Sequence, residues 1–203
     1  MKKIAKLLMI FVLILGLVWC GTVIADRQTL SDGLIRLHVV GASDTQEDQQ
    51  IKLQVRDALI GYLRQHMPEP EDVEAAKEAL KGMLSQLEET ANAALSAAGV
   101  TDRAKVTLTA EEFPTRHYDT FSLPAGIYES LRVTIGEGQG KNWWCVVFPS
   151  LCMPATTEGF ADTAAGAGFS DSLSGALQGQ SGYEFRFFLL DCMGWLQNLF
   201  SKG

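Results

Sequence analysis

Residue types that commonly carry catalysis are scarce in this chain. Its 203 residues include three histidines and four cysteines, and histidine is the commonest general acid or base in enzymes. Acidic residues outnumber basic ones, 24 to 17, which gives a formal net charge of −7. This balance argues against nucleic acid as a partner, because nucleic-acid-binding proteins present a basic face. It suits a soluble protein that stays off anionic membrane surfaces except where it is tethered.

The N-terminus has the pattern of an export signal. Lys2, Lys3 and Lys6 precede an uncharged apolar run over residues 7–25, which ends in Ala25. A basic start, an apolar run and a small residue at its end are typical of a signal peptide, with cleavage here after Ala25. The run is also long enough to span a bilayer, which takes about 20 residues. We therefore expect export, with residues 1–25 as a cleaved signal peptide or as a membrane anchor whose N-terminus stays inside.

Two of the cysteines beyond this leader lie close together in the sequence. Cys145 and Cys152 flank Pro149, and in an exported protein such a pair is expected to form a disulfide. Closing so short a loop would stabilise the fold by about 2–3 kcal/mol. Two buried free thiols are the alternative. Cys192 is then either free or paired between chains.

Hydrophobic periodicity predicts the fold class. Alternation of apolar and polar residues predicts strands at residues 34–40, 104–111, around 131–135 and at 143–148. Helical spacing of apolar residues predicts one helix from about 45 to 66, with Asp44 and Glu47 as a capping box, and a second helix from about 70 to 99. Prolines separate the two helices, so we expect an antiparallel pair that covers one face of a mainly antiparallel sheet. The expected class is α+β.

The C-terminal quarter differs in composition from the rest. Residues 155–182 are mostly Ala, Gly, Ser, Thr and Asp, so we expect a flexible linker after an α+β domain at 26–154. Residues 183–203 are strongly apolar again, with alternation that predicts a short strand at 183–187 and helical spacing after it. This tail either docks on its own sheet, which we favour, or is an apolar handle for a partner or a membrane.

Three glycines suggest a phosphate-binding loop. That chemistry needs a helix N-terminus directly after the glycines, so that free N–H groups meet the anion. Here Gly136, Gly138 and Gly140 are followed by the predicted strand at 143–148. We therefore expect a hairpin loop.

A set of polar and aromatic residues gathers around the first strand and the first helix. It can be structural salt bridging or a recognition surface, and the sequence leaves the two open. Trp143 and Trp144 are neighbours on a strand, so their side chains point to opposite faces. The candidate contact residues are Arg36, His38, Ser43, Asp44, Arg56, Asp57, Trp143 and Trp144, with Lys52 beside them on the helix.

A catalytic interpretation is the alternative. Cys145 could be a nucleophile with His117 as its base in an exported thiol- or cell-wall-acting enzyme. An exported cysteine with a partner nearby in the chain is more readily oxidised, which disfavours this role. No spacing of His, Cys or Asp matches a zinc or calcium site. We therefore expect no catalytic residue, metal or cofactor.

Several sequence blocks occur in order over about residues 34–153. They are Leu34-Ile35-Arg36-Leu37-His38-Val39-Val40 with Gly41-Ala42-Ser43-Asp44, then Leu123-Pro124-Ala125-Gly126-Ile127-Tyr128, and Asn142-Trp143-Trp144-Cys145-Val146-Val147-Phe148-Pro149 with Cys152. Together these blocks resemble the stage II sporulation protein R family.

The resemblance implies a function that periodicity alone does not give. Members of this family are made in the forespore of endospore-forming bacteria and exported into the space between forespore and mother cell. There they activate a membrane-embedded aspartic protease of the mother cell, which processes the precursor of the early mother-cell sigma factor. The resemblance therefore implies a signal that binds the extracytoplasmic part of this protease and is not itself an enzyme.

Overall fold

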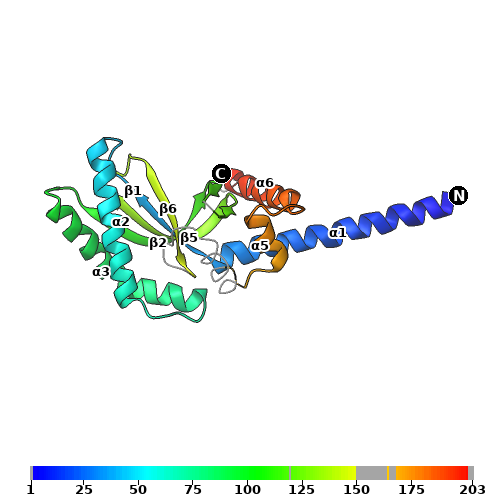
Figure 1. The fold of residues 1–203 in the computed structure, drawn as a ribbon, viewed down its shortest axis with the longest axis horizontal. Coiled ribbons are helices and arrows are strands. Elements are labelled where there is room, and N and C mark those ends of the chain that lie inside the picture. Colours follow the sequence, from blue (N-terminus) through cyan, green and yellow to red (C-terminus); the bar gives the residue numbers. More distant parts are fainter. Residues whose placement is uncertain (1, 119, 150–163, 165–167, 201–203) are drawn as a thin grey trace.

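The computed structural model describes residues 2–118, 120–149, 164 and 168–200. Its centre is a four-stranded sheet in the order β2-β5-β1-β6 (Figure 1). The strands are β1 (Ile35–Val40), β2 (Ala104–Phe113), β5 (Gly126–Ile135) and β6 (Asn142–Phe148). Two short strands, β3 (Arg116–His117) and β4 (Ser122–Leu123), form a separate pair.

The sheet is mixed and mainly antiparallel, which confirms the predicted α+β class. Strand β1 pairs parallel with β5 and antiparallel with β6, and β2 pairs antiparallel with β5. Because β1 lies between β5 and β6, the loop from Gly136 to Lys141 passes over the end of β1, and the predicted hairpin is wrong. Every residue of β1 is buried, and a central strand is covered on both edges as well as on both faces.

Two helices, α2 (Gln46–His66) and α3 (Val73–Ala97), cover one face of the sheet, as predicted (Figure 1). Each begins at a capping side chain: Thr45 accepts a hydrogen bond from the Asp48 N–H, and Asp72 accepts one from the Ala75 N–H. The predicted cap at Asp44 is therefore wrong by one residue. The apolar core between helices and sheet includes Leu37, Val55, Leu59, Leu80, Leu87, Leu131 and Val133, all without exposed surface.

The opposite face of the sheet has its own cover. It consists of the last turns of α1 (Lys2–Gly33), together with α5 (Asp171–Leu177) and α6 (Glu184–Phe200). The flexible linker predicted over 155–182 is therefore wrong for α5, whose Leu173 and Leu177 are buried in this second core. Residues 155–163 lie outside the described part of the chain.

The predicted strand at 183–187 is also wrong, because these residues open helix α6. A spacing of three to four residues brings Phe187, Leu190 and Gly194 onto one side of the helix, against the domain. A Cβ at Gly194 would lie 1.6 Å from the Ala125 carbonyl oxygen, so the helix backbone touches the start of β5. The C-terminal tail thus docks on its own domain.

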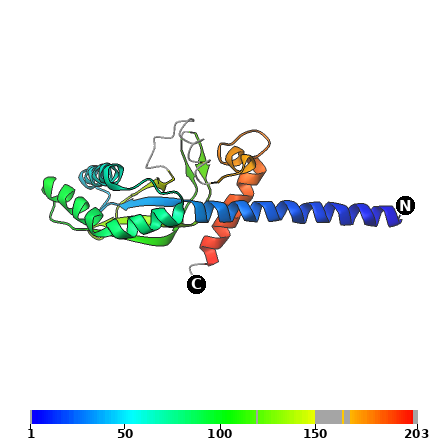
Figure 2. The same ribbon diagram turned by 90° about the horizontal axis from the view of Figure 1, so that it is seen from below.

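Helix α1 leaves the domain as a long rod (Figure 2). Among the described residues, one helix is long and apolar enough to cross a membrane, and it is the part of α1 from Lys6 to Gly33. Residues 6–22 are exposed, whereas Val23 and Leu30 are buried in the second core. The helix therefore continues through Ala25 without a break, and cleavage after that residue stays a prediction.

Candidate functional site at the edge strand

Strand β6 forms one edge of the sheet, and two neighbouring indoles stand near its start. Trp143 and Trp144 point to opposite faces, as successive residues of a strand must. Trp143, on the side of α2, is 38% exposed, whereas Trp144 on the other side is half-buried. The candidate residues of β1 and α2 divide between these two sides.

On the Trp144 side, a hydrogen-bonded chain runs across all four strands. The His38 ring stacks on Trp144 with centroids 3.8 Å apart. Its Nδ1 lies 3.0 Å from Glu111 Oε1, and its Nε2 lies 3.0 Å from Asn142 Oδ1. The second Glu111 oxygen accepts a hydrogen bond of 2.8 Å from Arg132. A carboxylate only accepts hydrogen bonds, so the Nδ1 atom of His38 carries a proton.

The carboxyl of Glu111 is held in its ionised form. Burial acts to raise the pKa of Glu111, but the hydrogen bond and charge of His38 and the charge of Arg132 outweigh it, so the pKa lies below its usual value. Glu111 and Arg132 were missed by the sequence analysis. Their signal was present in the alternation of β2 and β5, which places both on the face of His38.

Arg36 lies on the same face of β1 and is fully buried. Its Nη2 donates a hydrogen bond of 3.0 Å to the Tyr118 hydroxyl, and its guanidinium stands 4.0 Å above the Phe113 ring centroid. Desolvation by burial lowers the pKa of Arg36, although Tyr118 and Tyr128 oppose this shift. The Nε and Nη1 atoms have no hydrogen-bond partner among the described residues.

Two of the candidate contact residues, Arg36 and His38, are buried in this conformation. Arg36 has no exposed surface and His38 is 5% exposed. Alternation along β1 places both on the face away from α2 and α3, and that face is covered by the end of α1 together with α5 and α6. In this conformation Arg36 is not available to a partner.

On the other side of β6, a small group of candidates remains at the surface. The guanidinium of Arg56 lies 4.2 Å from the Trp143 ring centroid, a cation–π geometry. It also forms an ion pair of 2.7 Å with Asp57, whose side chain is 65% exposed. The structure thus brings Trp143, Arg56 and Asp57 together, and we call them the Trp143 patch.

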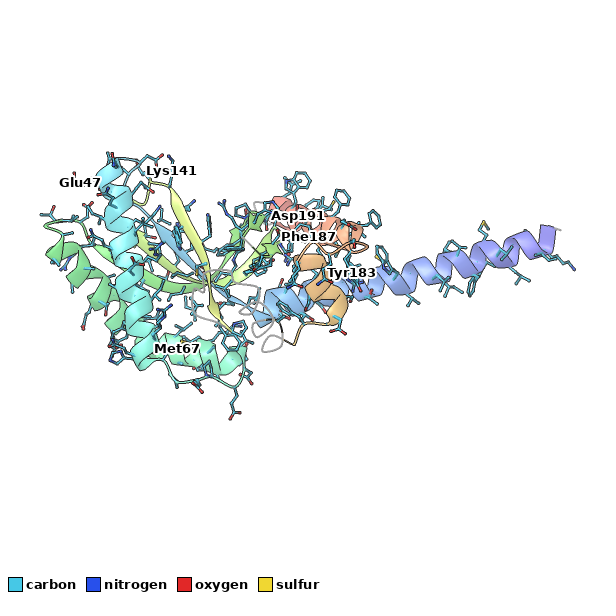
Figure 3. The ribbon with its side chains drawn as sticks, in the orientation of Figure 1. Glu47, Met67, Lys141, Tyr183, Phe187 and Asp191 are labelled. Atoms are coloured by element: carbon cyan, nitrogen blue, oxygen red, sulfur yellow. The ribbon has the colours of Figure 1, made fainter. Side chains whose placement is uncertain are left out.

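The candidate residues that follow β1 connect the loop after β1 with the loop before β6. The Asp44 carboxylate accepts a hydrogen bond of 2.7 Å from the Lys141 N–H, and Lys52 Nζ donates one of 2.9 Å to the Lys141 carbonyl. Figure 3 shows Lys141 beside the end of α2 at which Glu47 lies, far from Met67 at its other end. Burial lowers the pKa of the Lys52 ammonium, although Asp44 opposes this shift. In this conformation Asp44 and Lys52 therefore have a structural role, because both hold the loop before β6 in place.

Backbone contacts between the same two loops are very close. The Gly140 N–H donates a hydrogen bond of 2.9 Å to the Gly41 carbonyl. A Cβ at Gly140 would lie 2.2 Å from the Ser43 carbonyl oxygen, a separation that no side chain tolerates. Ser43 contributes further by accepting a hydrogen bond of 2.7 Å from the Gln49 amide at its carbonyl oxygen. The glycine motif therefore serves close loop packing.

The proposed cysteine–histidine pair is not assembled. Cys145 is opposite Leu37 in the sheet and packs in the core under α2 and α3. His117 is on β3, next to Tyr118, whose ring packs against the core on the opposite face, and its Nδ1 lies 2.8 Å from the Ser122 hydroxyl. Cys152 lies outside the described residues, so the disulfide with Cys145 stays a prediction. Within the described ranges, no three His, Cys, Asp or Glu side chains gather in a metal-binding group.

Comparison with known proteins gives one consistent answer. The model of the family described as Stage II sporulation protein R matches residues 31–158. Stage II sporulation protein R of Bacillus subtilis (strain 168) is 33% identical over 123 residues, which cover 61% of this chain and 55% of that protein. The match thus spans about half the length of this relative. No solved structure matches the chain. The family match takes in the sheet, the helix pair and the Trp143 patch, and the chain belongs to the Stage II sporulation protein R family.

Proposed function

We propose that this protein is an exported sporulation signal that activates a membrane-embedded aspartic protease of the mother cell. The protease then processes the precursor of the early mother-cell sigma factor. Family membership over residues 31–158 is the observation that carries the proposal. The long apolar helix α1 supports it, because a protein of the space between forespore and mother cell must be exported across a membrane.

In this proposal the protein acts as a ligand and has no catalytic step of its own. A ligand activates a receptor when it binds the active state more tightly than the inactive one. Moving an equilibrium from almost fully inactive to almost fully active requires a preference of about 10⁴-fold for the active state. Such a preference needs a contact surface that is rigid and chemically distinctive.

The Trp143 patch is the surface that best fits this role. Trp and Arg are the residue types most enriched among the side chains that dominate binding energy at interfaces. Trp143 stands on an edge strand, and Arg56 is pre-positioned on its ring by the rigid helix α2. His38 and Trp144 support the same strand from the opposite face. We propose that the extracytoplasmic part of the protease contacts the Trp143 patch.

Complementation tests both parts of the proposal. The full chain is expressed in a sporulating strain that lacks its own version of the protein, and maturation of the sigma-factor precursor is followed. We expect restored maturation with the natural chain. Trp143→Ala should lower it by about tenfold or more, as loss of a dominant interface side chain does, at unchanged protein level. Lys81→Ala, on the exposed side of α3, is the matched control.

The outcomes separate the function from the surface. If the natural chain is exported and folded but no maturation occurs, the proposed signalling function is wrong. If the natural chain restores maturation and Trp143→Ala does so equally well, the function stands and the assignment of the contact surface is wrong.

A further inference from the structure

Helix α6 has an inverted distribution of side chains for a surface helix. Its outward side is apolar and aromatic: Phe185 is 62% exposed, Phe188 60% and Trp195 58%. Leu199 and Phe200 extend the same side, at 53% and 80% exposure. In a water-soluble domain the outward side of a docked helix is polar. A contiguous aromatic side of this kind marks an interaction surface.

The polar side chains of α6 after its first residue face the domain. Arg186 forms an ion pair with Asp26 at the base of α1. The Asp191 carboxylate accepts a hydrogen bond of 2.8 Å from the Ala125 N–H. Gln197 accepts one of 2.9 Å from Arg27, and Asn198 donates one of 3.1 Å to the Phe113 carbonyl. Polar groups turned to protein and apolar groups turned outward are the arrangement of helices that contact lipid.

The location of α6 identifies what covers its aromatic side. The ring of Phe185 stacks on the indole of Trp19 in α1, with centroids 5.7 Å apart, and Phe188 stacks on Phe185 at 6.2 Å. Trp19 lies where the fully exposed apolar length of α1 gives way to the part that packs in the domain. Tryptophan at such a position is typical of the membrane–water interface. The aromatic side of α6 therefore begins at the level where α1 would leave the bilayer.

Helix α6 also runs in a direction that suits a position at the membrane surface. Figure 2 shows α6 crossing α1 near its base instead of running along the rod. The labelled residues Tyr183, Phe187 and Asp191 in Figure 3 lie between the strands and the free length of α1. A helix that crosses the base of a membrane anchor can lie along the membrane surface with one side in the headgroup and acyl boundary.

We propose that α6 is a membrane-interface helix: its aromatic side lies in the outer boundary of the bilayer that α1 enters, and its polar side holds the domain. The occupant of this surface is lipid. The signalling domain would then be fixed to the membrane at two points, α1 and α6, and could not rotate freely about α1. This inference does not depend on the receptor, since it concerns only lipid contact.

Photochemical labelling by lipid tests the proposal on the full chain. The protein is reconstituted into vesicles of phosphatidylethanolamine and phosphatidylglycerol that contain a phospholipid with a diazirine near its headgroup. After illumination, adducts are mapped by peptide mass spectrometry. We expect adducts on residues 185–200 as well as on α1.

Two variants make the result specific. Combined Phe188→Gln, Trp195→Gln and Leu199→Gln changes should lower the adducts on α6 relative to those on α1 by about tenfold, because interfacial binding scales with buried apolar area. These side chains are exposed, so the melting temperature should not change. Trp143→Gln, an exposed indole of β6, should leave the adducts on α6 unchanged. Adducts confined to α1 would overturn the proposal, and so would cross-links between α6 helices of two chains without lipid adducts.

Discussion

The imidazole of His38 stacks on the indole of Trp144, with ring centroids 3.8 Å apart and planes inclined by 18°. The two residues are also direct partners in the pairing of β1 with β6. Trp144 therefore covers the polar chain of the central strand, while its neighbour Trp143 lies at the surface on the other side, beside Arg56, and is 38% exposed. Adjacent tryptophans thus have different roles, one in the fold and one at the surface.

This division predicts opposite outcomes for two alanine variants. Trp144→Ala removes the ring that packs on His38 and Phe113, and we expect a loss of about 3–5 kcal/mol in the free energy of unfolding. Trp143→Ala should lose less than about 1 kcal/mol, as surface changes do. Thermal unfolding of the full chain in mild detergent measures both. Equal losses would contradict the division of roles.

Glu111 predicts part of the acid sensitivity of the fold. Its carboxyl has a lowered pKa in the folded state, so the stability it contributes is present above the ordinary carboxyl pKa of about 4.3 and is lost as pH falls through the lowered folded value. Glu111→Gln should therefore lower the melting temperature at neutral pH, and the difference from the natural protein should shrink in acid. Glu74→Gln, at an exposed ion pair with Lys77, should differ little at any pH. A difference for Glu111→Gln that is constant with pH would contradict the role of its charge.

Two glycine-to-alanine changes should act in opposite directions. At Gly140 the added Cβ would lie 2.2 Å from the Ser43 carbonyl oxygen, so the loops must separate, and we expect a loss of about 2–4 kcal/mol. At Gly82, inside α3, a Cβ meets nothing within 4 Å, and we expect a gain of about 0.5–1 kcal/mol from helix propensity. Melting temperatures measure both changes. A neutral Gly140→Ala would show that the loops are not held together in solution.

Two substitutions of Arg36 should separate the effect of its buried charge from the effect of its side-chain volume. Arg36→Ala leaves a cavity beside Phe113 and Tyr118, and we expect a loss of about 2–5 kcal/mol. Arg36→Met fills much of the same space with an apolar chain, which avoids the cost of burying a charge that has no ion-pair partner among the described residues. We therefore expect a melting temperature near that of the natural protein. A collapse of both variants alike would show that the guanidinium itself is essential to the fold.

The predicted disulfide can be tested by alkylation and intact mass. Cys20 and Cys192 are free and exposed, so the uncleaved protein should take up two alkyl groups before reduction and four after it. A protein cleaved after Ala25 should take up one and then three. Replacing Cys145 and Cys152 together by serine should lower stability by about 2–3 kcal/mol. Full alkylation without reduction would rule the disulfide out.

Local patterns in the sequence predicted the structural features that depend on residues close together in the chain. The apolar stripes of α2 and α3 and the alternation of β1, β2 and β5 correctly identified the core between helix pair and sheet. The same alternation puts Arg36 and His38 on the opposite face of β1. It could not show that this face is covered, because Leu30 and Leu190 cover it from the two ends of the chain.

The tail shows a second limit. Phe185 and Phe187 alternate with Glu184 and Arg186, which is also the pattern of a strand. The helix forms because packing at Leu190 and Gly194 continues the contact of Phe187 at helical spacing. The strand order could not be predicted for a similar reason. Strands β1 and β5 are far apart in the sequence, and local patterns do not indicate that they pair in parallel.

Helix α1 runs unbroken through Ala25, so the predicted cleavage after this residue depends on whether it precedes or follows folding. Val23 and Asp26 flank the predicted cleavage site, and both are packed into the finished domain. A peptidase needs locally opened backbone to cut. Under the proposed function, a chain cut before its sheet closes would become a diffusible messenger without the Val23 contact, whereas a chain that folds first would protect the bond and remain tethered. The relative speed of export processing and folding would therefore decide, under the proposed function, how far the signal can travel.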